Sequence, residues 1–135
     1  MEVMVTIAII GILCGIATPN FVKWLPRHRV GSAARDVMSA LEFARLNAIK
    51  ANGDVTLTFD FTGDRLTVVD SGGTTLRALG MPADVDLEDF GLGGLVTFSG
   101  HGFSTATGQV TVENTKDSTL LRSINLTLGG NASIQ

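Results

Sequence analysis

The hydrophobic and polar positions of the chain follow three patterns in succession. From Val3 to Ala17 there is no charged residue, and Ile, Val, Leu, Met and Ala dominate. Apolar residues then recur at steps of three and four, and in the last part they alternate with polar ones. These periods predict a wholly apolar helix, an amphipathic helix and a set of β-strands. We therefore expect a transmembrane or filament-core segment over 1–25, a helical stem over 26–52 and a β-rich head over 53–135.

The stem is predicted to bury one face. Arg35, Glu42 and Arg45 fall outside its apolar stripe, as expected for an amphipathic helix. The Ala-Asn-Gly sequence at 51–53 predicts a helix end near Lys50, and Pro26 predicts a bend near Leu25. The predicted packing stripe consists of Val30, Ala34, Val37, Leu41, Ala44 and Ala48.

The apolar segment contains an acid and three residues that weaken a helix. Glu2 lies at its start, where a carboxylate in apolar surroundings costs several kcal/mol unless it is neutralised. Each glycine costs a helix roughly 1 kcal/mol in water, and Pro19 cannot donate to the carbonyl of Gly15. Gly11, Gly15 and Pro19 therefore form a predicted weak point, at which the helix stretches or kinks outside lipid.

The length and flanks of this segment bear on its place in a membrane. Residues 3–19 would span only ~26 Å as a helix, slightly less than a bilayer core of ~30 Å. A signal peptide would open with basic residues, whereas this segment opens with an acid. The basic residues Lys23, Arg27 and Arg29 would pull the following side towards the cytoplasm. A head outside the cytoplasm is therefore expected only if a basic leader precedes residue 1.

The head is predicted to consist of short antiparallel strands on the end of the helix. Alternating residues and intervening Gly, Asp and Ser turns predict six or seven strands, and residues 81–94 are predicted to form a loop. Such spacing favours an α+β fold with a small sandwich or a pair of sheets. The predicted strands are 54–61, 65–70, 74–79, 95–99, 108–114 and 122–128.

Few residues suggest a metal-binding or catalytic site. The acidic run Asp84, Asp86, Glu88 and Asp89 has oxygen ligands that suit calcium, but it lacks the spacing of a known loop, and exposed acidic loops are common. Ser99 and His101 would share a face of a strand, but no acid is placed to orient the histidine. We therefore predict no metal, no cofactor and no enzymatic activity.

Charge is segregated along the chain. Residues 20–50 carry six basic and two acidic side chains (net +4), whereas residues 51–135 carry four basic and ten acidic ones (net −6). Either this pattern guides how copies of the chain contact one another, or it marks two ordinary solvated surfaces. Binding to DNA requires clustered basic residues on the exposed part, so the acidic head argues against it.

Two stretches of the sequence resemble known proteins. EVMVTIAIIGILCGIATPNF resembles the N-terminus of type IV pilins and type II secretion pseudopilins, and Glu2, Gly11 and Pro19 occupy the offsets of their glutamate, glycine and proline. RHRVGSAARDVMSALEFARLNAIKANGDVTLTFD is similar to the GspH/FimT branch of that family, as is VTFSGHGFSTATGQVTV in the head. The matching residues in the stem are Arg27, Arg29, Ser32, Ala33, Ala34, Ala44, Arg45, Ala48 and Ile49.

The resemblance implies a structural function. It implies a pilin-like fold, a subunit held in the bacterial inner membrane with its head in the periplasm, and later assembly into a periplasmic or cell-surface filament. The implied partners are the lipid bilayer, copies of the chain, other pilins or pseudopilins, an assembly platform and a prepilin peptidase. N-terminal methylation is also implied, and Glu2 would pair with the N-terminal amine of a neighbouring subunit. A DNA-binding minor pilin of a competence pilus is the alternative.

Two departures from the family pattern affect these expectations. The family has four residues before the glutamate, and this sequence has one. Either three residues and a leader precede residue 1, or the start is unusual. Asn131 stands where many members carry an arginine, which weakens the case for a basic DNA-binding loop near the C-terminus.

Overall fold

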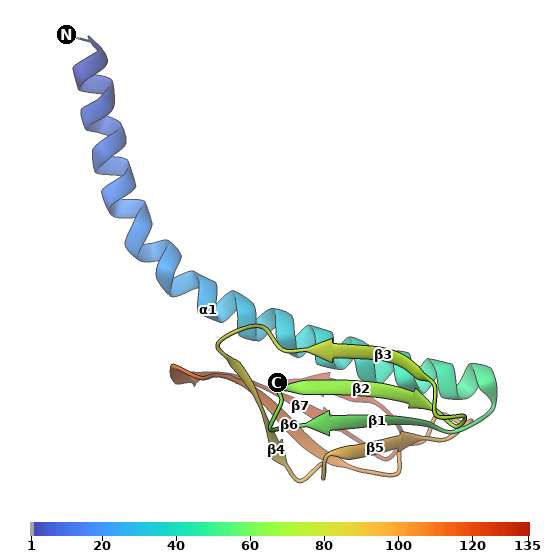
Figure 1. The fold of residues 1–135 in the computed structure, drawn as a ribbon. Coiled ribbons are helices and arrows are strands. Elements are labelled where there is room, and N and C mark those ends of the chain that lie inside the picture. Colours follow the sequence, from blue (N-terminus) through green and yellow to red (C-terminus); the bar gives the residue numbers. More distant parts are fainter. Residues whose placement is uncertain (1) are drawn as a thin grey trace.

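The computed structural model describes residues 2–135, and for residues 16–23 it describes the backbone alone. Met1 lies outside the described residues. One long helix is followed by a β-rich head (Figure 1). The elements are α1 (Glu2–Ala51), β1 (Val55–Asp60), β2 (Arg65–Asp70), β3 (Thr75–Gly80), β4 (Val85–Phe90), β5 (Leu95–Phe98), β6 (Gly108–Asn114), β7 (Asp117–Leu126) and β8 (Ala132–Ile134).

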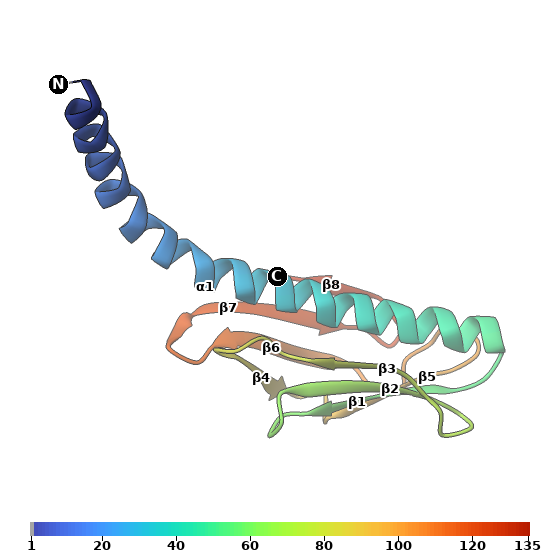
Figure 2. The ribbon, with the colours of Figure 1, turned by 45° about the horizontal axis from the view of Figure 1, so that its top comes forward.

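The helix α1 has two parts with different surroundings. Its N-terminal part projects away from the head, whereas its C-terminal part lies along the sheets (Figures 1 and 2). The helix is uninterrupted at Pro26, although the proline removes one backbone donor. The two parts run in different directions, so α1 is not a straight rod.

The C-terminal end of α1 is set by local sequence. Asn52 adopts a left-handed φ of 48° directly after the last helical residue. The N–H of Gly53 donates to the carbonyl of Ala48 at 3.1 Å, and that of Asn52 donates to Ile49 at 3.2 Å. This pair of bonds is the Schellman motif, which asparagine and glycine favour. The predicted helix end near Lys50 is confirmed.

The strands form two four-stranded antiparallel sheets. The first sheet has the order β3-β2-β1-β5, and the second has the order β4-β6-β7-β8. The inner faces of both sheets and one face of α1 enclose a single apolar core (Figure 2). Phe98, Leu57 and Ile124 are among its largest fully buried side chains. The fold is therefore α+β, with a long N-terminal helix packed against antiparallel sheets.

The head has more strands than the sequence predicted. Residues 81–94 are not a loop, because β4 lies within them: Val85 and Leu87 are buried while Asp86 and Glu88 point outward. This alternation has a period of two, as in any half-buried strand, although the acidic composition suggested a loop. β7 starts at Asp117 rather than at residue 122, and the short strand β8 was not predicted.

A capped corner links the two sheets between β4 and β5. The Asp89 carboxylate accepts hydrogen bonds from the backbone N–H groups of Gly91, Leu92 and Gly93 at 2.7–3.1 Å. Leu92 is buried beneath this turn. Asp89 therefore satisfies three donors that the change of sheet would otherwise leave without a backbone partner.

Asp64 joins the first sheet to the outer edge of the second. It lies in the β1–β2 turn with a left-handed φ of 47°, and its Oδ1 accepts a hydrogen bond from the N–H of Leu87 at 3.0 Å. Its carbonyl also accepts from the N–H of Met81 at 2.8 Å. The Asp64 side chain thus accepts a hydrogen bond from a backbone N–H of the edge strand β4. Unpaired N–H groups on such an edge are where strands of other molecules would otherwise pair.

Replacing Asp64 by alanine should lower the free energy of unfolding by about 1–3 kcal/mol, because a partly buried N–H loses its acceptor. Asp64→Asn is the matched control, since an amide oxygen still accepts and asparagine tolerates a left-handed φ. Thermal unfolding followed by circular dichroism measures both variants. Equal losses in the two variants would show that the charge of Asp64, and not its hydrogen bond, is what matters.

Candidate functional site

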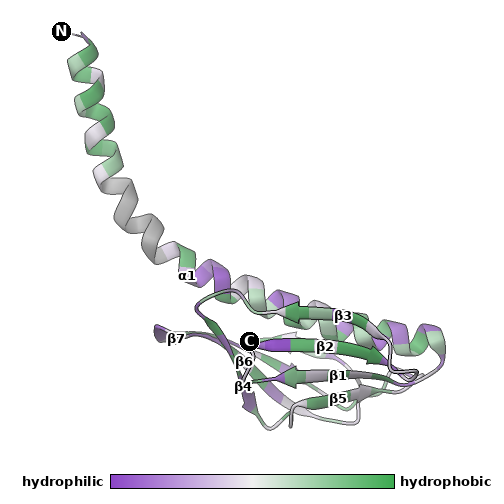
Figure 3. Ribbon diagram, viewed as in Figure 1, coloured by the Kyte–Doolittle hydropathy of each residue, from purple (hydrophilic) through white to green (hydrophobic). Residues whose placement is uncertain are grey.

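The N-terminal part of α1 presents apolar side chains in every direction. All described side chains from residue 2 to residue 15 are exposed, and the large aliphatic ones are 51–76% exposed (Figure 3). Complete burial of one such side chain is worth about 1.5–3 kcal/mol. An apolar surface of this extent is a site for contact with protein or lipid.

Glu2 lies in the first turn of α1, at the start of this apolar surface. An acid there is favoured by the helix dipole. Its side chain has no hydrogen bond or ion pair with another described residue, whereas its carbonyl accepts from the Thr6 hydroxyl at 2.8 Å. The predicted partner of Glu2, an N-terminal amine of another subunit, lies outside a single chain, so the pairing stays a prediction.

The predicted weak point lies on the same surface. Gly11 and Gly15 are in regular helix, and a Cβ at either position would meet no atom within 4 Å. The side chain of Pro19 lies outside the described residues. The weak point and the assignment of 1–25 as a membrane segment therefore stay predictions. Among the described residues, no helical stretch is both long enough and apolar enough to cross a membrane.

The stem buries its stripe against its own head. The six residues of the predicted stripe are at most 2% exposed, and Ala33 and Ala40 are buried with them. Five of these eight side chains are alanines, which allow the helix backbone to lie close to the sheets. The opposite side of the same helix remains open, with Leu46 64% and Ile49 45% exposed. Packing of the stem against other subunits stays a prediction.

One charged cluster fastens the start of the stem to the second sheet. Arg29 Nη1 lies 3.1 Å from Asp84 Oδ2, and Lys116 Nζ lies 2.7 Å from Asp84 Oδ1. The hydrogen bond from Lys116 is the main cause that lowers the pKa of the Asp84 carboxyl below its ordinary value of 3.8, and Arg29 adds to it. The sequence singled out Arg29 by its charge after the apolar segment and by the family resemblance, but it did not predict the partner of Arg29.

This cluster predicts a pH effect. A carboxyl whose folded-state pKa is lowered contributes stability above its unfolded pKa and loses it as pH falls through the folded pKa. Asp86 has the opposite sign, because partial burial and the nearby carboxylates of Asp64 and Glu88 raise its pKa. From pH 6 to pH 3, Asp84→Asn should therefore lose less stability than the parent chain and Asp86→Asn should lose more. Unfolding midpoints across this range test both signs.

A second cluster fastens the end of the stem to two loops. Arg45 Nε donates to the Gly102 carbonyl at 3.1 Å, and Arg45 Nη1 donates to Asn131 Oδ1 at 2.9 Å. Gly130 has a φ of 75°, and a Cβ there would collide with the Gly102 carbonyl oxygen. Arg45 thus joins the 99–104 and 127–131 loops to α1, a contact between distant segments that sequence alone did not reveal.

The structure does not bring the other candidate residues together as a metal site or a catalytic site. Within residues 2–135, outside any masked side chain, no group of three or more His, Cys, Asp or Glu residues is placed to bind a metal. Asp84 is paired with cations and Asp89 caps a turn, so the acidic run is divided among structural contacts. Ser99 donates to the Phe103 carbonyl at 3.4 Å, and His101 is exposed in the adjacent turn.

Comparison with known families identifies the chain. The model of the family described as type II transport protein GspH matches residues 33–130, which cover most of the stem and the head. The chain belongs to the GspH family. Pseudopilins of this family are structural proteins of the cell envelope and are not known as enzymes. None of the curated proteins matches the chain.

Solved structures share the fold of this GspH-family chain. The type IV minor pilin FimU of Pseudomonas aeruginosa has a TM-score of 0.69 at 18% identity, with 81% of this chain and 90% of that chain covered. The minor pseudopilin EpsH of Vibrio cholerae has a TM-score of 0.66 at 13% identity, with 79% and 96% covered. The suspected resemblance to the GspH/FimT branch and the predicted pilin-like fold are therefore confirmed.

Proposed function

We propose that this GspH-family chain is a minor subunit of a pilin-like filament and that it enters the filament through the N-terminal part of α1. The single observation that carries the proposal is the exposed apolar surface of residues 2–15 on a chain whose head has a closed core. The large aliphatic side chains of this surface remain more than half exposed beside the other described residues. A bundle of similar helices would bury it on all sides.

The arrangement of the stem supports the same proposal. Arg29 and Arg45 hold its two ends to the head, and small side chains seal its inner face. The head is thereby carried at a fixed position along the C-terminal part of α1 (Figure 2). A rigid head on a projecting helix suits a subunit with its head on the filament surface and its helix in the core.

The proposed location follows from the same surface. Before assembly, residues 1–25 would lie in the inner membrane with the head in the periplasm, and after assembly they would lie in the core of a pseudopilus or pilus. The filament would be a type II secretion pseudopilus or a type IV pilus. The partners would be other pilin-like subunits, and the assembly platform and the prepilin peptidase would act on the chain before incorporation.

Sheared filaments test the proposal. An epitope-tagged chain should be recovered with them, and a variant with Ile7→Asp and Ile10→Asp should be absent from them. Thr74→Asp, which adds a charge to an exposed turn of the head, is the control and should be incorporated normally. Absence of the parent chain from every filament of its own cell would contradict the proposal.

The predicted weak point of the helix at Gly15 and Pro19 leads to a second testable prediction. Gly15→Ala combined with Pro19→Ala should stiffen the helix and reduce incorporation several-fold, because alanine favours helix by about 1 kcal/mol over glycine and about 3 over proline. Gly31→Ala is the matched control: it lies in the stem, where an added Cβ would meet Arg35 Nη1 at an ordinary contact distance of 3.7 Å. Immunoblots of the filament and membrane fractions measure the ratio of incorporated to unincorporated chain. Unchanged incorporation of the double variant would refute the weak point.

A further inference from the structure

The start of the stem carries basic residues on a side of α1 that the core does not bury. Residues three, four and seven positions apart in a helix share one side, and five residues between 24 and 35 have this spacing. The four of them that carry a side chain are exposed, whereas the predicted packing stripe on the other side of the same turns is buried. These five residues, called the basic face below, are Trp24, Arg27, His28, Gly31 and Arg35.

The two arginines of the basic face lie around a glycine. A Cβ at Gly31 would meet Arg35 Nη1 at 3.7 Å, so the Arg35 side chain reaches back one turn towards the N-terminus, as long side chains in helices do. Arg27, His28 and Arg35 line one hollow together with Gly31. The rings of His28 and Trp24 have centroids 4.8 Å apart. Because position 31 has no side chain, a recess remains among these groups.

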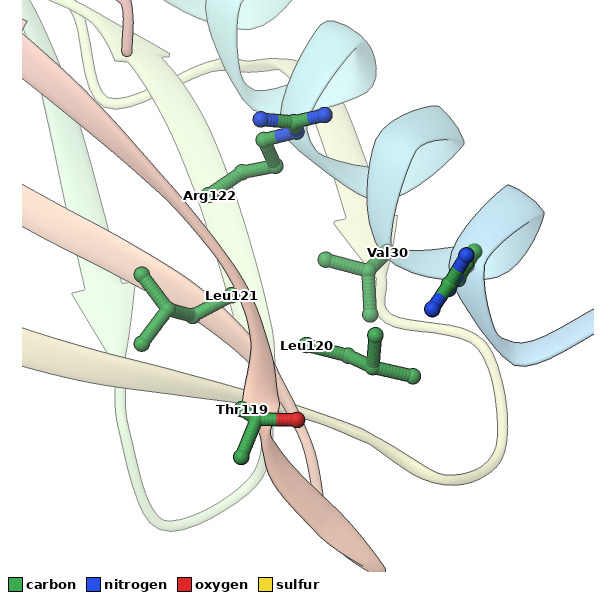
Figure 4. A pocket seen from close by; sticks show the side chains of 6 residues that line it. Val30, Thr119, Leu120, Leu121 and Arg122 are labelled. Carbon is green, nitrogen blue, oxygen red and sulfur yellow. The ribbon is translucent and has the colours of Figure 1, made fainter.

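The arginines of the basic face are not neutralised within the described part of the chain. Neither Arg27 nor Arg35 makes a hydrogen bond or an ion pair with another described residue. The pKa of Asp117 is lowered mainly by hydrogen bonds from Thr119, and the charge of Arg27 contributes least to that shift. Arg122 lies on the helix side of β7 (Figure 4) and lines the same hollow, so it adds to the positive charge. The complement of this surface is therefore an anion.

The basic face begins where the predicted membrane segment 1–25 ends. Trp24 is 53% exposed at this boundary, and tryptophan is enriched in the headgroup layers of membranes. At about 1.5 Å per residue, Arg27 would lie about 3 Å beyond residue 25, and Gly31 about 9 Å beyond it. The headgroup layer on each side of a bilayer is about 5–8 Å thick. α1 turns away from the sheets towards its N-terminus (Figures 1 and 3), so a bilayer around residues 1–25 would place lipid phosphates level with the basic face.

We propose that the basic face binds the phosphate groups of anionic phospholipids in the periplasmic leaflet before the chain enters a filament. Arg27 and Arg35 would donate hydrogen bonds to phosphate oxygens above Gly31. Basic residues usually collect on the cytoplasmic side of a membrane helix, so orientation in the membrane does not account for arginines on the periplasmic side, whereas contact with anionic lipid does. The proposal rests on the proposed location of residues 1–25 in the inner membrane.

The first test uses the fluorescence of Trp24, the single tryptophan of the chain. The full chain is reconstituted in vesicles of phosphatidylcholine with one third phosphatidylglycerol, and one lipid at a time carries bromine atoms near the top of its acyl chains, where bromine quenches Trp24. Quenching should show a preference for phosphatidylglycerol of at least about fivefold, the contribution expected of one arginine near an anionic surface. Equal quenching by both lipids would overturn the proposal and leave the membrane location intact. Absence of quenching by either lipid would contradict the location and the proposal with it.

Variants assign the lipid preference to the two arginines. Arg27→Gln with Arg35→Gln should bring the preference for phosphatidylglycerol close to one, and the fold should be unchanged because neither side chain bonds to another described residue. Arg27→Lys with Arg35→Lys should keep part of the preference, since the charge remains and the forked donor geometry is lost. Arg65→Gln, which lies exposed on the first sheet, is the control and should keep the parent value. An unchanged preference in the double glutamine variant would show that the basic face does not bind lipid.

Inorganic phosphate separates a lipid site from a site for free phosphate. At equal ionic strength and pH, sodium phosphate and sodium chloride should lower the preference for phosphatidylglycerol by the same factor, because both then act only by screening charge. A larger loss in phosphate would show that the recess at Gly31 takes free phosphate, and the assignment to lipid would be wrong.

Discussion

Replacing Glu2 by glutamine or alanine should stop incorporation into filaments while the fold and the membrane association of the chain stay unchanged. The Glu2 side chain makes no hydrogen bond or ion pair with another described residue, so the substitution breaks nothing within the chain. In a filament core, a carboxylate that has lost its partner amine, or an amine that has lost its carboxylate, is an uncompensated buried charge. Removal of one partner of such a pair costs about 3–5 kcal/mol, a factor of at least a hundred in association.

The comparison of substitutions at Glu2 isolates the charge. Glu2→Asp keeps a carboxylate on a shorter side chain, so it should restore part of the incorporation that Glu2→Gln loses. The amounts in the filament and membrane fractions are compared by immunoblot, with circular dichroism confirming equal helix content. Normal filaments containing Glu2→Gln would show that Glu2 has no role in docking, whatever the apolar surface does.

The Gly108→Ala variant should lose about 3 kcal/mol of unfolding free energy. A Cβ at position 108 would lie 2.6 Å from both the carbonyl carbon and the carbonyl oxygen of Gly91. Both neighbours are backbone atoms of the capped corner that links the sheets, where Asp89 fixes three N–H groups. Neither side can move without separating β6 from that corner, so the added methyl group acts as overpacking.

Gly80→Ala is the matched control for Gly108→Ala. It also lies at the end of a strand, but a Cβ there would meet no atom within 4 Å. It should therefore change stability by no more than about 0.5 kcal/mol. Denaturant unfolding of both variants gives the difference, and equal stabilities would mean that the close contact between Gly108 and Gly91 does not exist in solution.

The helix and the first sheet could be predicted from local sequence because their signals are local. Ala-Asn-Gly at 51–53 carries the C-terminal cap within itself, and the stem stripe repeats at helical spacing. The alternation in β1 is likewise visible residue by residue, since Val55, Leu57 and Phe59 are buried. No information from distant parts of the chain was needed for these elements.

The second sheet was harder to predict because one of its strands carries a conflicting signal and another carries almost none. Asp86 and Glu88 made β4 look like an acidic loop, yet Val85 and Leu87 show the period of a strand. β8 has three residues, too few for any periodicity, and its existence depends on β7 beside it.

The contacts that build the candidate sites were not predictable for a different reason. Arg45 meets Gly102 and Asn131, 57 and 86 positions away, so the fold must be known before the partners are. Glu2 differs again, because its proposed partner belongs to another molecule and only the family resemblance suggested it.

Photo-crosslinking from Ile10 tests most directly whether the apolar part of α1 packs against other subunits. Ile10 is 58% exposed, and a benzoylphenylalanine at this position would face whatever covers the helix. The account predicts crosslinks to the N-terminal helix of another pilin-like subunit in the filament fraction, and their loss with Glu2→Gln. Crosslinks to lipid alone in every fraction, or the same crosslinks with and without Glu2, would contradict it.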